Sequence, residues 1–346
     1  MTFPLLPAML AAFSAMSPDM PPERNAPDAM MDDILARCAG GKAAGDASAG
    51  MADKILPAGF RLRHYVIERA LGSGGFGVTY LAREDFLNRE VVIKENFSAS
   101  VCCRRASDLH VVSCTEEDAA SCGWILENFQ REARLLGDLN HPSIARVYSF
   151  FTALGTAYYV MEYIEGRSLD KVAGDSRRAG WPISQDGLYG LMVRVLDALD
   201  CLHGRSLLHG DVKPDNVLVR RNGLPVLIDF GAVREMSVES AKNVVESAGF
   251  SPPEQSLPNG RLGPWSDIYA FGATLCYILT GELLPAGSRR LLYDDVRPLA
   301  RREELLRLYH PRLLMSIDKA ISPPRVGDRY ASVSEWMADL AGSSAS

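Results

Sequence analysis

Two short apolar strands and the loops that follow them decide the fold: LLHGDVKPDNVLV at residues 207–219 and LPVLIDFGAV at residues 224–233. The polar side chains of these loops are Asp211, Lys213, Asn216 and Asp229. Short loops held between apolar strands keep functional side chains in defined places. We therefore expect two carboxylates, an amide and an ammonium group to converge on one site.

This set of side chains suits the transfer of a phosphoryl group. Oxygens of Asn216 and Asp229 are the hard ligands that Mg2+ prefers, with Mn2+ as the alternative cation. Asp211 then remains to accept a proton from an attacking hydroxyl group. Lys213 can offset negative charge on the phosphoryl group.

A glycine-rich loop lies earlier in the chain, GSGGFGV at residues 72–78. Gly72, Gly74 and Gly77 lack the Cβ that would keep backbone N–H groups away from phosphate oxygens. A dinucleotide-binding fold would need a helix after this loop, but VTYLARE at residues 78–84 has the composition of a strand. We therefore predict a hairpin that covers phosphates, and a plain glycine-rich turn is the alternative.

A lysine and a glutamate follow the loop. VVIK at residues 91–94 is rich in β-branched residues, so we expect a strand that presents the Lys94 ammonium group on one face. Apolar residues then recur at helical intervals around Glu132, after a capping-box pattern of Ser113 with Glu116. A carboxylate on that helix could fix the Lys94 head beside nucleotide phosphates, and a solvated glutamate is the alternative.

Length and composition limit the class of protein. The 346 residues have room for about two compact units, and 47% hydrophobic with 23% charged residues is typical of a folded chain. A formal charge of -6 argues against a nucleic-acid partner. No apolar stretch has the length that a membrane helix requires. The apolar start has no Lys or Arg before it, so we expect a cytoplasmic protein and no membrane span.

The character of the sequence changes along the chain. Residues 1–55 are rich in Pro, Ala and Gly without periodicity, which predicts a disordered tail. Residues 56–164 consist mostly of strand-like stretches, and residues 165–342 are mostly helical in pattern. We therefore predict an α+β fold in which a β-rich lobe precedes an α-rich lobe, with a cleft between them.

The chain has seven cysteines, at positions 38, 102, 103, 114, 122, 201 and 276. An odd number in a chain of this size favours reduced thiols over a disulfide framework. Four of them fall between Cys102 and Cys122, but they lack the paired spacing of zinc sites. We therefore expect free thiols and no structural metal.

The segments GSGGFGV, VVIK, HGDVKPDN, DFG and SPPE together resemble the signature set of eukaryotic-type protein kinases, and their bacterial Ser/Thr branch in particular. The resemblance runs from about Leu56 to Leu340 with the motifs in family order. It implies a two-lobed fold, with one regulatory helix in the β-rich N-lobe and an α-rich C-lobe. It also implies transfer of the ATP γ-phosphoryl group to Ser or Thr hydroxyl groups of proteins.

The resemblance assigns nucleotide-binding roles by position. Lys94 would hold the phosphates while it is paired with Glu132, and Met161 would gate the adenine pocket. Backbone groups of Glu162 and Ile164 would contact the base. The apolar residues around adenine would be Val78, Val92 and Leu218.

Other positions resemble structural anchors of the family. Glu254 and Arg329 look like the pair that anchors the activation segment. Asp267 resembles the aspartate that binds the backbone of the catalytic loop. An apolar stack that couples the two lobes would consist of Leu136, Val147, His209 and Phe230.

The sequence departs from the family pattern at several places. Gly210 replaces an arginine that usually meets a phosphate, so phosphorylation of Ser237, Ser240 or Ser247 would lack its charge partner. We therefore hypothesise activity that needs no such phosphorylation. Ser247 also stands where the family usually has a threonine bound to the catalytic aspartate. Val92 replaces an alanine, which would loosen ATP binding.

An insertion at residues 97–115 separates the strand of Lys94 from the helix of Glu132. It would be either a regulatory or partner-binding segment or an inert surface loop. A docking partner could also bind residues 1–55. Because His-Gly-Asp also resembles small-molecule phosphotransferases of the aminoglycoside and choline type, that activity is the enzymatic alternative. A nucleotide-binding pseudokinase scaffold is the alternative without catalysis.

Overall fold

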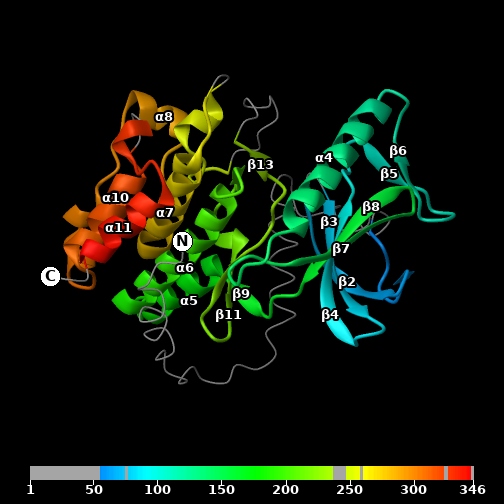
Figure 1. Ribbon diagram of the computed structural model, residues 1–346, viewed down its shortest axis with the longest axis horizontal. Coiled ribbons are helices and arrows are strands. Elements are labelled where there is room, and N and C mark those ends of the chain that lie inside the picture. The colour runs from blue at the N-terminus through cyan, green and yellow to red at the C-terminus, as the bar shows by residue number, and fades with distance from the viewer. Residues whose placement is uncertain (1–54, 75–76, 237–246, 258–259, 323–325, 344–346) are drawn as a thin grey trace. The chain divides into compact units, whose positions relative to one another are not determined.

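The computed structural model describes residues 55–74, 77–236, 247–257, 260–322 and 326–343 (Figure 1). The predicted tail at residues 1–55 therefore falls outside the described residues except for Ile55. The described chain divides into two compact units. The N-terminal unit comprises residues 55–140 and 145–163, and the C-terminal unit comprises residues 141–144 and everything from Ile164 on.

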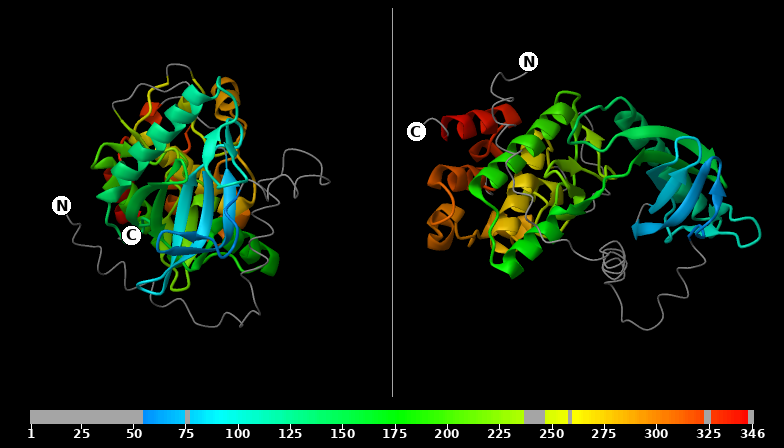
Figure 2. Two further views of the ribbon diagram at one scale, coloured as in Figure 1. Left: turned by 90° about the vertical axis from the view of Figure 1, so that its right-hand side faces the viewer. Right: turned by 90° about the horizontal axis from the view of Figure 1, so that it is seen from below.

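The N-terminal unit is built on one antiparallel sheet with the strand order β1-β2-β3-β4-β8-β7, whose blue and cyan strands lie side by side in both views of Figure 2. A separate ribbon pairs β5 with β6. The elements of the unit are β1 (Arg61–Leu62), β2 (Tyr65–Gly74), β3 (Gly77–Glu84), β4 (Arg89–Asn96), β5 (Cys102–Arg104), β6 (Val111–Ser113), α4 (Ala119–Gly137), β7 (Val147–Ala153) and β8 (Thr156–Glu162).

Alternation along β4 decides which side chains face the core. Val91 and Ile93 are fully buried in the apolar core of the unit, together with Tyr80 and Tyr158 of the neighbouring strands. Successive side chains of a strand point to opposite faces, so Lys94 lies on the other face of β4. That face receives α4, which packs against β4, β7 and β8.

Helix α4 begins later than the capping-box pattern indicated. Ser113 lies in β6, so the predicted capping box with Glu116 is wrong. The backbone N–H and the Oγ1 hydroxyl of Thr115 instead donate to Asp118 Oδ2, at 3.1 and 2.8 Å. Because β6 extends through Ser113, the chain needs this turn before the helix can begin at Ala119.

The apolar period of α4 is confirmed by its buried face, which consists of Phe129, Glu132, Ala133 and Leu136. The phenyl ring of Phe129 stacks on the ring of Tyr159 in β8, with 4.9 Å between ring centroids. The helix therefore carries the carboxylate of Glu132 into a buried position on the sheet.

The C-terminal unit is mostly helical. Its longest helices are α6 and α7, and the apolar face of α6 from Leu188 to Leu202 is buried. Its larger elements are α5 (Leu169–Ala179), α6 (Gln185–His203), α7 (Pro264–Thr280), α8 (Gly287–Leu292), α9 (Glu303–Leu306), α10 (Pro311–Ala320) and α11 (Val333–Ser343). None of the described helices is both long and apolar enough to cross a membrane.

Short strands and 3-10 turns of the C-terminal unit hold its loops. Strands β12, β11 and β9 form a small sheet, and β10 pairs with β13. These elements are β9 (Gly166–Ser168), β10 (Leu207–Leu208), η2 (Pro214–Asn216), β11 (Val217–Arg220), β12 (Pro225–Leu227), β13 (Arg234–Glu235), η3 (Pro253–Ser256), η4 (Leu299–Arg301) and η5 (Val326–Asp328). The loops that carry the predicted catalytic residues leave β10 and β12.

Candidate active site

A single carboxylate, that of Asp211, gathers the polar side chains of the loop after β10. Lys213 Nζ donates to Asp211 Oδ2 at 2.7 Å, and Asn216 Nδ2 donates to the same oxygen at 3.0 Å. Ser247 Oγ donates to Asp211 Oδ1 at 2.6 Å and accepts from Lys213 Nζ at 3.1 Å. The structure therefore brings the predicted trio together and adds the hydroxyl group of Ser247.

Asp229 lies next to this group through the pairing of β11 with β12. The backbone N–H of Ile228 donates to the carbonyl oxygen of Asn216 at 2.9 Å. Asp229 itself has a left-handed backbone with φ of 58°, and Gly231 N–H lies 3.4 Å from its Oδ1. Such a backbone is uncommon for a residue other than glycine, so the surrounding loop must hold it, and this fixes the direction of the Asp229 side chain.

The donors at Asn216 and Asp229 suit a magnesium ion. The amide nitrogen of Asn216 is committed to Asp211, so the amide oxygen is its ligating atom. Among residues that the structure describes, no cluster of three or more His, Cys, Asp or Glu is arranged to hold a metal. A cation here would therefore take few ligands from the chain and further oxygens from a phosphate or water, as Mg2+ does.

Asp267 of α7 fixes the backbone of the loop that leads into Asp211. Asp267 Oδ2 accepts the N–H of His209 and Asp267 Oδ1 accepts that of Gly210, each at 2.9 Å, and His203 Nε2 lies 2.9 Å from Oδ2. Burial favours a higher pKa for Asp267. The hydrogen bond and charge of His203, together with the charge of His209 and the hydrogen bond from Gly210, outweigh it, so the pKa lies below its usual value. These are the backbone hydrogen bonds that the family resemblance implies.

Gly210 needs to be glycine in this structure. Its φ is 77°, and a Cβ at this position would lie 2.6 Å from the carbonyl oxygen of Ala232. A side chain would therefore meet both backbone strain and a steric clash. The carbonyl oxygen of Gly210 accepts from Gln255 Nε2 at 3.3 Å, which connects the loop to the residue that follows the SPPE segment.

Glu254 and Arg329 form the predicted anchor of the SPPE segment. Arg329 Nη1 lies 2.9 Å from Glu254 Oε1 and 3.1 Å from Oε2, and both side chains are buried. Ser266 Oγ donates to the same carboxylate at 2.9 Å. A buried pair of this kind is costly to break from one side.

In the N-terminal unit, Lys94 and Glu132 form the expected ion pair. Lys94 Nζ lies 3.2 Å from Glu132 Oε1, and the two side chains are 12% and 10% exposed. The hydroxyl group of Tyr159 donates to the same Oε1 atom at 2.7 Å. Glu132 is therefore a fixed, nearly buried partner, so the alternative of a solvated glutamate is wrong.

The glycine-rich loop is the tip of the β2–β3 hairpin, as predicted. Gly72 and Gly74 are paired residues of β2, and Gly74 faces Gly77 across the hairpin. A Cβ on Gly77 would lie 2.4 Å from the carbonyl oxygen of Glu95, so the close approach of β3 to β4 requires glycine there. Residues 75–76 lie outside the described residues.

The predicted adenine-binding residues belong to both units. Val78 is buried, and Val92 of β4 pairs directly with Met161 of β8. The N–H of Glu162 donates to the carbonyl oxygen of Arg146 at 2.8 Å. In the C-terminal unit, Ile164 is buried and Leu218 is half-buried. Their contact with adenine stays a prediction.

The residues of the predicted apolar stack also belong to both units. Leu136 and Val147 are buried in the N-terminal unit. His209 and Phe230 lie in the C-terminal unit with 5.0 Å between their ring centroids. Coupling through all four side chains stays a prediction.

Sequence reasoning missed a buried charge network beside Lys94. Glu95 is fully buried and accepts hydrogen bonds from the hydroxyl groups of Tyr80 at 2.7 Å and Tyr158 at 2.5 Å. Arg104 of β5 donates to Glu95 Oε2 at 2.6 Å, and both side chains of this ion pair have 0% exposure. Burial and the charge of Glu95 raise the pKa of both tyrosines. The alternation of side chains along β4 could have revealed the buried position of Glu95, because it puts this residue on the core face.

The insertion is thus part of the N-terminal core and is not an inert surface loop. Phe97, Cys102 and Val111 belong to the same buried cluster as the sheet. The expectation of reduced thiols throughout is also wrong, because Cys103 and Cys114 form a disulfide. Their pairing depends on the register of β5 with β6, which cysteine spacing does not show.

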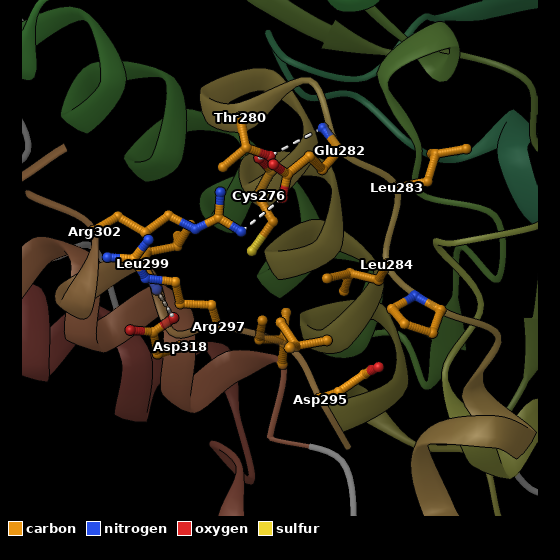
Figure 3. A pocket seen from close by; sticks show the side chains of 13 residues that line it. Cys276, Thr280, Glu282, Leu283, Leu284, Asp295, Arg297, Leu299, Arg302 and Asp318 are labelled. Atoms are coloured by element: carbon orange, nitrogen blue, oxygen red, sulfur yellow. Dashed lines mark hydrogen bonds and ion pairs between the residues drawn. The ribbon is translucent and has the colours of Figure 1, made fainter. Parts of the chain in front are cut away.

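A pocket of about 320 Å³ lies elsewhere in the C-terminal unit (Figure 3) and contains none of the predicted site residues. Cys276, Arg302 and Asp318 are among its lining residues. Arg302 Nη2 donates to Glu282 Oε2 at 2.7 Å, and Asp318 accepts two backbone N–H groups. Both charged groups are hydrogen-bonded to neighbouring segments of the unit. We therefore assign the pocket no part in the candidate active site.

Comparisons with known proteins agree with this geometry. The family model described as protein kinase domain matches residues 65–305. Serine/threonine-protein kinase D of Synechocystis sp. is 34% identical over 235 residues, which are 64% of this chain and 42% of the relative. Serine/threonine-protein kinase PknA of Nostoc sp. is 34% identical over 231 residues, which are 63% of this chain and 37% of the relative. A solved structure titled "PpkA-294 apo form" is 30% identical with a TM-score of 0.72, and the match covers 83% of this chain and 99% of that one.

This chain belongs to the protein kinase domain family. The predicted resemblance to bacterial Ser/Thr kinases and the α+β kinase-like fold are confirmed. The chain spans less than half the length of the two curated relatives.

Proposed function

We propose that this chain is an ATP-dependent protein kinase that phosphorylates serine and threonine side chains of proteins. The observation that carries the proposal is the contact of Ser247 with Asp211. A seryl hydroxyl group donates to the carboxylate at 2.6 Å while Lys213 Nζ lies 3.1 Å from the hydroxyl oxygen. An acceptor serine or threonine in an equivalent place would have its proton beside a base and its oxygen beside a cation. The names of the curated relatives support the same activity.

In this proposal the C-terminal unit carries the chemistry. Asp211 orients the acceptor hydroxyl group and takes its proton as the oxygen attacks phosphorus. Lys213 offsets the charge that develops on the phosphoryl oxygens. Asn216 and Asp229 would hold Mg2+. When bound, ATP with Mg2+ would supply the γ-phosphoryl group, and ADP would be the leaving group.

The N-terminal unit carries the groups that hold the nucleotide. The ammonium group of Lys94, fixed by Glu132, would bind phosphate oxygens, and the glycine hairpin at Gly72–Gly77 would cover them with backbone N–H groups. Met161 would line the adenine pocket, and the backbone of Glu162 would contact the base. Val92 would add bulk against the adenine ring.

The test is phosphoryl transfer from radiolabelled ATP by the full-length chain, with casein as acceptor and Asp211→Asn as the inactive variant. We expect transfer by the wild type and a loss of at least about 100-fold in Asp211→Asn. Asp215→Asn is the matched control, because Asp215 is an exposed carboxylate of the same loop. Phosphoamino-acid analysis should yield phosphoserine or phosphothreonine.

The alternatives give different results in the same assay. A small-molecule phosphotransferase would label kanamycin or choline and leave casein unlabelled. A pseudokinase scaffold would show no transfer with either the wild type or Asp211→Asn. The presence of Lys94, Asp211, Asn216 and Asp229 favours a catalyst over a scaffold.

The cytoplasmic location and a docking partner for residues 1–55 or 97–115 also stay proposals. Residues 1–54 lie outside the described residues. Within the insertion, Val112 is 41% exposed, so β6 offers an apolar side chain to a protein partner. Fluorescently labelled full-length chain and a chain that lacks residues 1–54 would show by microscopy whether that segment affects location.

A further inference from the structure

Two free cysteines meet where the insertion reaches helix α4. Cys102 lies in β5 and is buried, and Cys122 lies in the first turn of α4 and is half-buried. Their Sγ atoms are 2.8 Å apart, and Cys122 Sγ also donates to the carbonyl oxygen of Val101 at 3.2 Å. Figure 1 shows β5 and β6 beside the end of α4 where the helix begins. The two thiols thus join parts of the chain that are 20 residues apart.

These thiols form a site separate from the Cys103–Cys114 disulfide, which we call the hairpin disulfide. Neighbouring residues of a strand point to opposite faces, and in β5 Cys102 is buried whereas Cys103 is exposed. The sulfur atoms of Cys102 and Cys122 therefore lie on the core face, and the hairpin disulfide lies on the outer face. This division also argues against one tetrahedral zinc site built from all four sulfurs.

The separation of the two thiols is close to that of a covalent bond. A disulfide holds its sulfur atoms roughly 2.05 Å apart, so Cys102 and Cys122 need to approach by less than about 1 Å. Rotation of a side chain or a small shift of the first turn of α4 is enough for such a movement. The rest of the N-terminal unit can stay as it is.

We propose that Cys102 and Cys122 are a reversible redox couple whose disulfide fastens the first turn of α4 to the insertion. The bond would hold the helix in the position in which Glu132 contacts Lys94, because that ion pair is present while the two sulfurs are already adjacent. The oxidised chain therefore keeps the ion pair, and the reduced chain lets α4 move more freely. An effect of this bond on phosphoryl transfer rests on the proposed kinase function, whereas the redox couple itself does not.

Oxidation requires a two-electron oxidant, and glutathione disulfide is of the right chemical class. The more exposed Cys122, as thiolate, attacks one sulfur of glutathione disulfide, which forms a mixed disulfide and releases one glutathione thiolate. The Cys102 thiolate then attacks the Cys122 sulfur, which forms the protein disulfide and releases the second. The two protons from the cysteines go to the two glutathione thiolates.

The test maps disulfides in the full-length chain after native incubation with glutathione disulfide at about pH 9. Burial and the adjacent Cys102 thiol raise the pKa of Cys122, so the thiolate that must attack is scarce at neutral pH. The remaining thiols are then alkylated with N-ethylmaleimide. Digestion with trypsin and a glutamate-specific protease leaves Cys122 alone on peptide 118–127 and Cys102 on peptide 96–104. The hairpin disulfide joins peptides 96–104 and 106–116 in either state. We expect peptide 118–127 to join this assembly after oxidation and to leave it after dithiothreitol. Peptide 118–127 that stays alkylated, or that carries glutathione, would overturn the proposal.

The effect on α4 is measured by amide hydrogen exchange of the full-length chain. Oxidation should slow exchange in the first turns of α4 at least about threefold in the wild type. The same treatment should leave exchange unchanged in Cys122→Ser and should slow it as in the wild type in Cys201→Ser, a free cysteine of the C-terminal unit. Equal exchange before and after oxidation of the wild type would show that the bond does not fasten the helix.

Kinase assays separate the two proposals. Oxidised wild type should transfer phosphate at least as fast as reduced wild type, because the bond preserves the contact of Lys94 with Glu132. Loss of transfer on oxidation would refute the direction of the effect. Absence of transfer in both states would refute the kinase function alone, because disulfide mapping and hydrogen exchange do not depend on catalysis.

Discussion

Replacement of Arg104 by methionine should destabilise the N-terminal unit more than any change at an exposed arginine of the insertion. Arg104 and Glu95 form an ion pair in which both side chains have 0% exposure. Methionine keeps the apolar stem of the side chain but leaves the Glu95 carboxylate buried without its cation. Breaking such a pair from one side costs about 3–5 kcal/mol.

The remaining contacts place the loss near the lower end of that range. The hydroxyl groups of Tyr80 and Tyr158 still donate to Glu95 in the variant. The hydrogen bond of Arg104 Nη1 to the carbonyl oxygen of Leu109, at 3.0 Å, is lost as well, and it adds about 1 kcal/mol. We therefore expect a loss of about 3–4 kcal/mol in the free energy of unfolding of this unit.

The assay is urea unfolding of the full-length chain, with pulsed amide exchange to follow the peptides of β4 and β5. Arg105→Met is the matched control, because Arg105 pairs with Asp108 at the surface, where the two side chains are 54% and 42% exposed. We expect no measurable change in that control. The double variant Glu95→Gln with Arg104→Met should recover at least about 2 kcal/mol, because it removes the buried charge.

Equal unfolding midpoints for Arg104→Met and Arg105→Met would refute the reasoning. That result would mean that the Glu95 carboxylate is solvated, or that the insertion can leave the sheet without cost. Failure of the double variant to recover would show that the hydrogen bonds of Arg104, rather than its charge, stabilise the insertion.

Three further outcomes follow from the geometry. Gly210→Ala should lower the free energy of unfolding of the C-terminal unit by about 1–3 kcal/mol, because φ is positive and a Cβ would clash with Ala232, and thermal unfolding would measure it. The folded-state pKa of Asp267 is depressed, so the stabilising effect of the ionised carboxylate is complete above the unfolded pKa of about 3.9 and is lost as pH falls through the folded pKa. The difference in free energy of unfolding between wild type and Asp267→Asn should therefore narrow below about pH 4, and acid titration would measure it. Burial, the adjacent Cys102 thiol and Asp118 raise the pKa of Cys122 to about 12, so its alkylation rate should rise about tenfold per pH unit between about pH 7 and 10, and a plateau near pH 8 would contradict this.

The parts of the site that the sequence predicted are those whose residues are joined by local structure. Asp211, Lys213 and Asn216 lie within six consecutive positions, so one loop conformation brings them together. Lys94 and Glu132 are farther apart, but the period of a strand and the period of a helix each fix a face. Their contact then required only that the helix pack on that face of the sheet.

The insertion could not be predicted in the same way. The pairing of Cys103 with Cys114 depends on the register of a ribbon three residues long on each side, and short ribbons carry little register information. The partner of Glu95 lies nine positions further on, across a turn. Alternation in β4 did place Glu95 on the core face, and a buried carboxylate requires a partner. What the sequence lacked was the fold of the insertion, which supplies Arg104.

Gly210 and Ser247 together bear on the hypothesis that the proposed kinase activity needs no phosphorylation of the activation segment. Ser237 and Ser240 lie outside the described residues, so the structure bears on Ser247 alone. Its hydroxyl group is bound to Asp211 and Lys213, and a phosphate there would place about two negative charges against the Asp211 carboxylate. The phosphate would also compete with Asp211 for the ammonium group of Lys213. Gly210 has no side chain, so no guanidinium group is present at that position to bind the phosphate. Phosphorylation of Ser247 should therefore lower the rate of phosphoryl transfer. In this proposal the unphosphorylated hydroxyl group of Ser247 is the active form.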